Sequence, residues 1–464
     1  MVFADREAEL EALRRLERRS GGKLLVVFGR RRVGKTSLLV HYQQQSRHRS
    51  LYIYVDLLKR EDLLTQISRD VSAQLGMPAS FRTWDELWKY IGDIAGKGLL
   101  VVVDEFQRLR TVSPEALTML QRAWDEKLRH LPLFLVLMGS SVGMVRRLAV
   151  DSRGALFGRA TGILHVRPFT YAQARALIPG PEVRRIELYA AFGGTPHYLS
   201  LALATPGDLW RKLRGLVFES ISPLREEPLN VLAAELRDPE KYYSILRAIA
   251  SGKRALGEIA DASGVSQNRL MYYLGTLESL FGVVRRDDPV LGGRKSRRYA
   301  LDDPFFRFWF RFVHRNVPML EMGELRAVME TVRQEFAAHV GTVFESIVRE
   351  LVGIYSGRSL GGLRIEPERI GAWWDRRGHE VDLCAPMRDG SVLLGDVTWS
   401  SKGITVGHLE NLRLKAKLIS PRSEKRFLLA GRRVDEEVRE AMGKDGIVLD
   451  LDDLTKAFDK AGRV

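Results

Sequence analysis

The sequence of 464 residues contains a single cysteine, Cys384, so no disulfide can form within the chain. A chain without disulfides fits a reducing compartment, and we expect a cytoplasmic location. No apolar run is long enough to cross a bilayer, since the run at residues 131–138 has only the length of a strand. The first residues also lack the apolar core of a signal peptide. These absences predict a protein that neither spans a membrane nor enters a secretory route.

The chain also contains fewer acidic than basic residues: it has 58 Asp and Glu and 73 Lys and Arg, which gives a formal net charge of +15. This balance favours a polyanionic partner, most simply nucleic acid, and DNA is the partner we expect. The alternative is a composition that is rich in arginine throughout, because total charge does not reveal patches. The length exceeds that of one hydrophobic core, so we expect two to four domains.

A glycine-rich motif lies near the start of the chain, between an apolar run at residues 24–28 and a helical pattern from Ser37. Its pattern is a glycine, four residues, and Gly-Lys-Thr, in the strand–loop–helix context of a phosphate-binding loop. Glycines let the backbone wrap closely around phosphate oxygens, which the loop N–H groups then contact. We expect Lys35 to reach the β- and γ-phosphates of ATP or ADP and Thr36 to hold Mg²⁺. The expected phosphate-binding residues are Gly29, Arg30, Arg31, Arg32, Val33, Gly34, Lys35, Thr36 and Ser37.

A second apolar run, residues 99–103, ends in Asp104 and Glu105. Its valines and leucines are typical of a buried parallel strand, and open α/β sheets bind ligands at the carboxyl ends of such strands. We therefore expect Asp104 to hold Mg²⁺ and Glu105 to orient or deprotonate the attacking water.

A third apolar strand, residues 133–138, leads to Ser140 and Ser141. The Ser140 hydroxyl can contact the γ-phosphate or the water, or it can simply cap the next helix. Arg153 and Arg159, farther along, are candidate sensors of phosphate charge. The alternation of strands and helices predicts an α/β fold with a doubly wound parallel sheet.

Several of these segments together resemble the archaeal-type ATPase family, which belongs to the signal-transduction (STAND) NTPases close to the AAA+ class. The resemblance rests on Phe3-x-x-Arg6-Glu7, the phosphate loop, Asp104-Glu105-Phe106-Gln107, Gly139-Ser140-Ser141, Leu156-Phe157-Gly158-Arg159 and Gly193-Gly194-Thr195-Pro196-His197-Tyr198-Leu199. It implies a helical lid with Pro196 over the adenine, although a Gly-Gly-x-Pro bend between helices needs no ligand. Arg6 can line an adenine pocket or mark a solvated helix start.

The middle of the chain has the pattern of a winged helix-turn-helix. Helical patterns at residues 242–250, 255–262 and 267–280 precede two short strands, residues 283–286 and 298–301, around a basic tip. The groove-facing candidates on the third helix are Gln267, Asn268, Arg269 and Tyr272, and the phosphate-contacting candidates at the tip are Arg294, Lys295 and Arg297. The alternative is a winged helix that only packs on the nucleotide domain. The aromatic segment after it, residues 302–310, suits a buried docking helix better than base stacking.

The last part of the chain carries acids in a helix and in two predicted strands. It resembles the restriction-endonuclease-like C-terminal domain, with a PD-(D/E)XK pattern, that accompanies these archaeal ATPases. The resemblance makes Glu345 the helix acid, with Asp382 and Asp396 as acids that hold Mg²⁺ for phosphodiester cleavage. The lysine of the pattern falls at Thr398, so an active site would need Lys402 instead, or Lys415 or Lys417 on the next helix.

The expected division is therefore a P-loop ATPase core (residues 1–169), a helical lid (170–238), a winged helix-turn-helix (239–315) and a nuclease-like domain (316–464). Three functions are in view. The first is a Mg²⁺-dependent ATP-binding and ATP-hydrolysing switch that acts on or with DNA. The second is an ATP-gated DNA endonuclease, and the third is a regulator without catalysis that holds ADP and binds DNA. An oligomer remains open, because no arginine is clearly a finger that acts on a neighbouring subunit.

Overall fold

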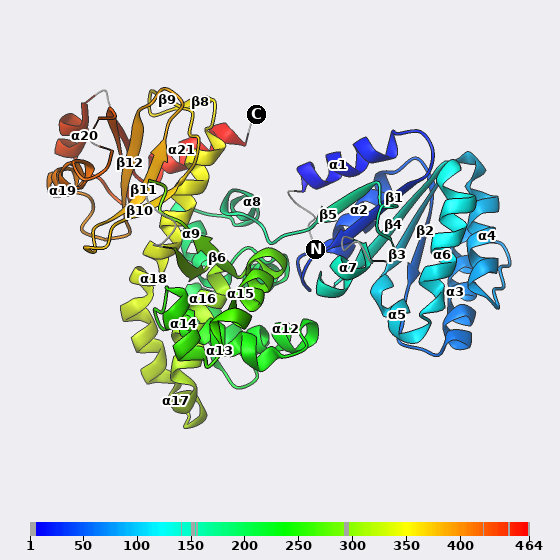
Figure 1. The fold of residues 1–464 in the computed structure, drawn as a ribbon. Helices are drawn as coiled ribbons and strands as arrows, with labels where there is room; N and C mark the ends of the chain where they lie inside the picture. The colour runs from blue at the N-terminus through cyan, green and yellow to red at the C-terminus, as the bar shows by residue number, and fades with distance from the viewer. Residues whose placement is uncertain are drawn as a thin grey trace. The chain divides into compact units, whose positions relative to one another are not determined.

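The computed structural model of the chain describes residues 6–140, 142–149, 154, 156–291, 297–420, 422–443 and 446–462. Phe3, Ser141, Arg153, Arg294 and Lys295, all singled out from the sequence, lie outside the described residues. The chain divides into two compact units (Figure 1): unit 1 is Met1–Pro168 with Ala233–Arg237, and unit 2 is Phe169–Leu232 with Asp238–Val464. Each unit is considered by itself below.

Unit 1 contains a five-stranded sheet in which every pair of neighbours is parallel, with the strand order β2-β3-β4-β1-β5. The strands are β1 (Lys23–Phe28), β2 (Arg49–Tyr54), β3 (Leu99–Asp104), β4 (Leu133–Gly139) and β5 (Gly162–His165). In register, Phe28 lies opposite Gly139, and Asp104 lies opposite Met138. The carboxyl ends of β1, β3 and β4 therefore meet at one edge of the sheet, which confirms the predicted α/β architecture.

The helices of unit 1 cover both faces of this sheet. They are α1 (Glu7–Glu17), α2 (Lys35–Gln45), α3 (Arg60–Leu75), α4 (Trp84–Ile94), α5 (Leu109–Val112), α6 (Glu115–Glu126) and α7 (Val142–Ala149). Leucines of α1 and α2 pack against Val27 and Val102 of the sheet, and Figure 1 shows α3, α4 and α6 gathered on its other side. Every residue of β1, β3 and β4 is buried. Burial on both faces explains why these strands are continuous apolar runs.

Unit 2 begins with helices. They are α8 (Tyr171–Leu177), α9 (Glu182–Phe192), α10 (Pro196–Ala204), α11 (Leu209–Leu213) and α12 (Glu227–Glu235), the last of which ends in unit 1. Next come α13 (Pro239–Ala250), α14 (Leu256–Ser263) and α15 (Gln267–Thr276), followed by an antiparallel pair, β6 (Val284–Asp287) and β7 (Arg298–Leu301). The helix predicted to reach residue 280 ends as an α-helix at Thr276 and continues as a π-helical turn, Leu277–Phe281, before left-handed Gly282.

The aromatic segment after β7 forms α16 (Pro304–Phe308) and a π-helical turn, Trp309–Val313. Its aromatic residues are all at most 3% exposed: Phe305, Phe306, Phe308, Trp309, Phe310 and Phe312. Rings that are buried to this degree are not available to stack on bases, so the segment is core, as its aromatic density predicted.

The C-terminal part of unit 2 is a mixed five-stranded sheet in the order β10-β11-β12-β13-β14. After α17 (Val317–Glu321), α18 (Leu325–Ile354) and the small hairpin β8 (Arg358–Leu360) and β9 (Leu363–Ile365), the strands are β10 (Gly371–Trp374), β11 (Glu380–Pro386), β12 (Val392–Thr398), β13 (Lys425–Gly431) and β14 (Gly446–Leu449). The helices α19 (Val406–Ala416), α20 (Glu436–Met442) and α21 (Leu451–Ala461) complete it. The first three strands are antiparallel and the last three parallel.

Candidate functional site

The phosphate loop connects the end of β1 to the start of α2 at the carboxyl edge of the unit 1 sheet. Gly34 has φ 88 and Arg32 has φ 70, so both adopt left-handed conformations that a glycine tolerates best. A Cβ on Gly29 would lie 2.2 Å from the carbonyl oxygen of Val166, so only glycine fits there. The backbone curvature that the motif predicted is therefore present in this loop.

The Lys35 ammonium is buried under the loop. Its Nζ donates to the carbonyl oxygens of Gly29, at 2.7 Å, and Arg30, at 3.1 Å. Burial lowers the pKa of Lys35, while the carboxylates of Glu235, Glu105 and Asp104 oppose this shift. A cation is thus held inside an anion-binding loop and faces the acids at the ends of the neighbouring strands.

Asp104 ends β3 and lies next to Tyr52 of β2. Its carboxylate accepts hydrogen bonds from the Tyr52 hydroxyl and, at 2.7 Å, from the backbone N–H of Glu105. Burial raises the pKa of Asp104. Burial also raises the pKa of Tyr52, whereas a hydrogen bond with Thr36 lowers it. The Tyr52 hydroxyl therefore interacts with both of the expected Mg²⁺ ligands, Asp104 and Thr36. Tyr52 is not part of any motif, and its position in the strand that pairs with β3 is the one feature that places it here.

Glu105 follows in a left-handed conformation, with φ 55, which is uncommon for a residue other than glycine. Its carboxylate accepts hydrogen bonds from the Ser140 hydroxyl, at 2.9 Å, and from the Gln107 amide. Ser140 is buried just beyond the end of β4. The backbone turn and these two donors fix the Glu105 carboxylate, and Gln107 joins the site although it was not among the predicted site residues.

Two further side chains hold the phosphate loop itself. Arg6 is buried and donates to the carbonyl oxygens of Val33, at 2.8 Å, and Arg167, at 2.9 Å. Glu235, at the end of α12, accepts a hydrogen bond of 2.9 Å from the backbone N–H of Arg31. Its other oxygen, Oε2, is buried and has no hydrogen-bond partner among the described residues, and burial raises the pKa of Glu235 to about 7. The Glu235 carboxylate therefore accepts a hydrogen bond from a loop N–H of the kind that donates to phosphate oxygens.

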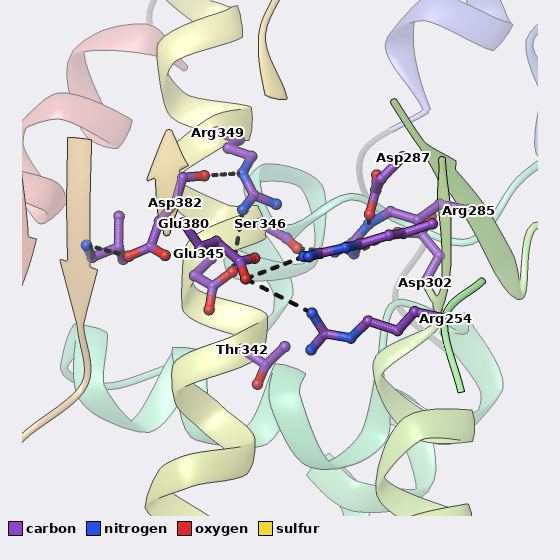
Figure 2. A network of polar contacts seen from close by, with 12 residues as sticks. Arg254, Arg285, Asp287, Asp302, Thr342, Glu345, Ser346, Arg349, Glu380 and Asp382 are labelled. Atoms are coloured by element: carbon purple, nitrogen blue, oxygen red, sulfur yellow. Dashed lines mark hydrogen bonds and ion pairs between the residues drawn. The ribbon is translucent and has the colours of Figure 1, made fainter. Parts of the chain in front are cut away.

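The C-terminal acids come together in unit 2. The ladder between β11 and β12 ends at Leu383 and Gly395, and beyond it the Asp382 carboxylate accepts the Val397 N–H at 2.9 Å. Arg349 of α18 donates to the Asp382 carbonyl oxygen, at 2.7 Å, and to the Glu345 carboxylate, at 3.2 Å. Figure 2 shows Glu345 and Asp382 together beside Arg349.

Burial and nearby charges shift the pKa values of these acids. Burial and the charge of Glu345 raise the pKa of Asp382 to about 7, and Asp396 adds to the shift. Burial also raises the pKa of Glu345. Within the described ranges, however, no group of three or more His, Cys, Asp or Glu side chains has an arrangement that could hold a metal ion. The acids meet, but without the tight convergence of a preformed metal site.

The lysine that this acidic site would need is not beside the acids in any described contact. Thr398 is half-buried at the end of β12, where it pairs with Gly431, and Lys402 is exposed in the turn that follows.

The candidates for DNA contact lie in the helical segment before the C-terminal sheet. Gln267, Asn268, Arg269 and Tyr272 are all exposed on α15. Arg297 forms an ion pair of 2.8 Å with Asp288. In the part of the chain that the structure describes, no helix is both long and apolar enough to cross a bilayer.

Comparison with known proteins matches two separate parts of the chain to two families. Residues 3–202 match a family described as an ATPase domain predominantly from Archaea. Residues 3–202 of this chain are therefore similar to archaeal ATPase domains. Residues 309–411, beyond that ATPase domain, match a second family, described as archaeal and bacterial proteins of unknown function.

Individual relatives of the ATPase are distant in sequence. An uncharacterised protein of Methanocaldococcus jannaschii is 28% identical over 462 residues, which cover 98% of this chain and 100% of that protein. The Walker-type ATPase of Pyrococcus abyssi is 22% identical with a TM-score of 0.51, covering 67% of this chain and 96% of its own. The ORC2 protein of Aeropyrum pernix, solved with ADPNP and ADP, is 17% identical with a TM-score of 0.43, covering 68% and 95%. The likeness to the Pyrococcus abyssi ATPase shows a shared fold.

One predicted residue of the ATPase domain is misplaced. Arg159 forms an ion pair of 2.7 Å with Asp125, close to the end of α6. Two residues later, Thr161 donates to the carbonyl oxygen of Leu24 at the amino end of β1. The phosphate loop starts after Phe28, roughly 13 Å farther along the strand. Arg159 therefore lies at the opposite edge of the sheet, and its prediction as a phosphate sensor is wrong for this conformation.

Pro196 lies in unit 2, at the first turn of α10. The preceding bend is tight, because Phe169 N–H donates to the Gly194 carbonyl oxygen at 2.7 Å and a Cβ on Gly194 would lie 1.8 Å from the Phe169 carbonyl oxygen. This packing alone requires glycine. A contact between Pro196 and adenine stays a prediction.

Proposed function

We propose that the protein is a Mg²⁺-dependent switch that binds and hydrolyses ATP and acts on or with DNA. The observation that supports it most is the arrangement in unit 1, where the Lys35 ammonium lies under a curved glycine loop and interacts electrostatically with Asp104 and Glu105. Oriented N–H groups and a buried cation favour a polyphosphate tail, and adjacent carboxylates favour the metal that accompanies it.

Each residue has a role that follows from its contacts. Lys35 neutralises the β- and γ-phosphates, which requires it to leave the carbonyl oxygens that it now contacts. The Thr36 hydroxyl and the Asp104 carboxylate are oxygen ligands of the type that Mg²⁺ prefers, and the bound ion would supply positive charge next to the phosphates. Glu105, held by Ser140 and Gln107, orients or deprotonates the attacking water.

The DNA part of the proposal rests on unit 2 and on charge. Three helices followed by an antiparallel pair, α13 to β7, suit a winged helix-turn-helix, and α15 carries exposed polar residues at the groove-facing positions. The net charge of +15 favours a polyanion. The domain boundaries at residues 170, 239 and 316, a cytoplasmic location and an oligomeric state stay predictions.

Release of phosphate from ATP by the purified protein tests the proposal. Lys35→Ala removes the buried ammonium, whereas Lys59→Ala removes an exposed lysine at the start of α3 and serves as the control. We expect turnover in the wild type and in the control and a large loss in Lys35→Ala. Tightly bound ADP without turnover would instead identify a regulator without catalysis.

An ATP-gated DNA endonuclease is the second candidate, favoured by the meeting of Glu345, Asp382 and Asp396 in unit 2. Its weakness is Thr398, which offers no ammonium to stabilise the charge that develops on the phosphate. Incubation of supercoiled and linear DNA with Mg²⁺ or Mn²⁺ tests it, with Asp382→Asn as the comparison. Cleavage that requires Asp382 would support this function, and cleavage that persists in Asp382→Asn would assign it to another site or to a contaminant.

A further inference from the structure

A cavity of about 750 Å³ lies within unit 2, beside the acids but on the side of the helical segment. Its lining comes from the end of α13, the strands β6 and β7, the turn after α16, helix α18 and the strands β10 and β11. Eight arginines line it, against four carboxylates and no lysine. Figure 2 shows part of this wall, with Glu345 and Glu380 between Arg349 on one side and Arg254 and Arg285 on the other.

The four carboxylates do not neutralise all eight arginines, because two of these carboxylates each pair with two arginines. Glu380 contacts both Arg298, at 3.2 Å, and Arg254, at 3.9 Å. Glu335 is shared in the same way, at 3.2 Å from Arg311 and 3.3 Å from Arg315. The cavity thus keeps an excess of positive charge.

Two arginines carry this excess most clearly. Arg307 donates from Nη2 to the Leu301 carbonyl oxygen, but its Nη1 is buried without a hydrogen-bond partner. Burial and the neighbouring Arg285 lower the pKa of Arg307 to about 10, which reflects the cost of holding this cation. At the rim, Arg247 is exposed and forms no ion pair with any described residue. An unpaired buried cation is unfavourable unless an anion joins it.

The lining also narrows the class of anion. Guanidinium groups bind phosphate oxygens through two parallel hydrogen bonds, and their spread over five or more elements suits several linked phosphates better than one. Three aromatic rings in the wall, Tyr299, Phe310 and Trp374, are at most 5% exposed, and the ring of half-buried His314 stacks on Trp309, so the wall offers little ring surface to a base. Recognition would therefore depend on the backbone and not on the bases. A volume in the range of small-ligand sites admits a few linked nucleotides of one strand but not a double helix.

We propose that this arginine-lined cavity binds the phosphodiester backbone of a single nucleic-acid strand, without regard to sequence, next to the Glu345 carboxylate. Arg307 holds the phosphates inside, whereas Arg285 is already paired with Asp287 and Asp302. Arg247 and Arg254 receive the strand at the rim. This inference rests on the proposed action on DNA and deepens it, because it assigns the strand to the cavity and not to the exposed face of α15.

Fluorescence anisotropy of a labelled 12-nucleotide single strand, titrated with the full chain in EDTA to prevent cleavage, tests the proposal. The variants are Arg307→Gln inside the cavity and Arg247→Gln at its rim. Arg326→Gln, on an exposed part of α18 that does not line the cavity, is the control with the same change of charge. Because Arg307 is largely buried, its variant is first compared with the wild type in thermal unfolding, and exposed Arg247 provides a change that does not disturb the core.

We expect each cavity variant to weaken single-strand binding about five- to tenfold, and the slope of log affinity against log salt to fall by about 0.7 for each lost phosphate contact. The control should bind as the wild type does. Single-strand binding that is unchanged in both cavity variants, or reduced equally in Arg326→Gln, would overturn the proposal while leaving the action on DNA intact. No binding of single or double strands would refute this inference and the DNA part of the proposed function together, whereas ATP turnover, measured separately, tests the nucleotide site.

Discussion

At the scale of single residues, a buried ammonium and a partly buried carboxylate of the protein both contact the backbone of the phosphate loop. Lys35 donates to loop carbonyl oxygens, and the carboxylate of Glu235 accepts a loop N–H. Both contacts use groups that a bound polyphosphate would require. We therefore expect nucleotide binding to displace the Glu235 carboxylate from the Arg31 N–H.

Replacement of Glu235 by alanine measures that displacement. Because the variant frees the Arg31 N–H and removes a negative charge from the loop, we expect ATP to bind about tenfold more tightly, which corresponds to one hydrogen bond to a charged group. Glu226→Ala, an exposed acid at the start of the same helical segment, is the control for the change of charge. Calorimetric titration gives both affinities, and weaker binding in Glu235→Ala would show that the carboxylate supports the loop instead of competing for it.

The site residues that could be predicted from the sequence belong to local motifs, whereas the residue that could not be predicted makes a contact far away along the chain. Lys35, Thr36, Asp104 and Glu105 were predictable, because local motifs fix their positions at the ends of adjacent strands. Glu235 was not, since it reaches Arg31 across 204 positions of sequence and no local pattern marks it.

At the scale of elements, the sheet of unit 1 followed directly from three apolar runs, because strands that are buried on both faces leave a continuous hydrophobic signal. The position of Arg159 was not predictable in this way, because it depends on strand pairing and not on a local hydrophobic pattern. Its sequence neighbours resemble a family motif, but only the pairing of Thr161 with Leu24 shows that this segment meets the amino end of β1. Strand direction, and not composition, decides which edge of a sheet a residue reaches.

The long helix α18 provides an element-scale prediction about pH. His339 is fully buried among Phe308, Phe312 and Phe336, and its Nε2 lies 2.8 Å from the Ala190 carbonyl oxygen. A carbonyl oxygen only accepts, so Nε2 carries the proton of a neutral ring. Burial lowers the pKa of His339 to about 3.

The unfolded chain binds a proton at this histidine below about pH 6.5, whereas the folded chain does not until about pH 3. Stability is therefore fully present above pH 6.5 and falls as the pH is lowered through this window, by about 2 kcal/mol between pH 7 and pH 5. His339→Gln keeps a donor for Ala190 but does not titrate. Denaturant unfolding at the two pH values should show a smaller loss in this variant, and an equal loss would assign the acid sensitivity to other groups.

At the scale of the whole molecule, the chain combines residues 3–202, which are similar to archaeal ATPase domains, with a second compact unit that has its own mixed sheet, its own acids and its own basic cavity. The net charge of +15 is a global quantity, and the cavity of unit 2 shows one place where cations gather. Sequence predicted the excess but not its location, because the lining arginines come from segments between residues 247 and 349 that only folding brings together.

Phosphate release from ATP in the presence of Mg²⁺ is the measurement that bears most directly on the account, because every role assigned in unit 1 depends on a polyphosphate seated over Lys35. The account predicts steady release by the wild type and by Lys59→Ala, and a rate lower by about a hundredfold or more in Lys35→Ala. Equal rates in the wild type and Lys35→Ala would contradict it.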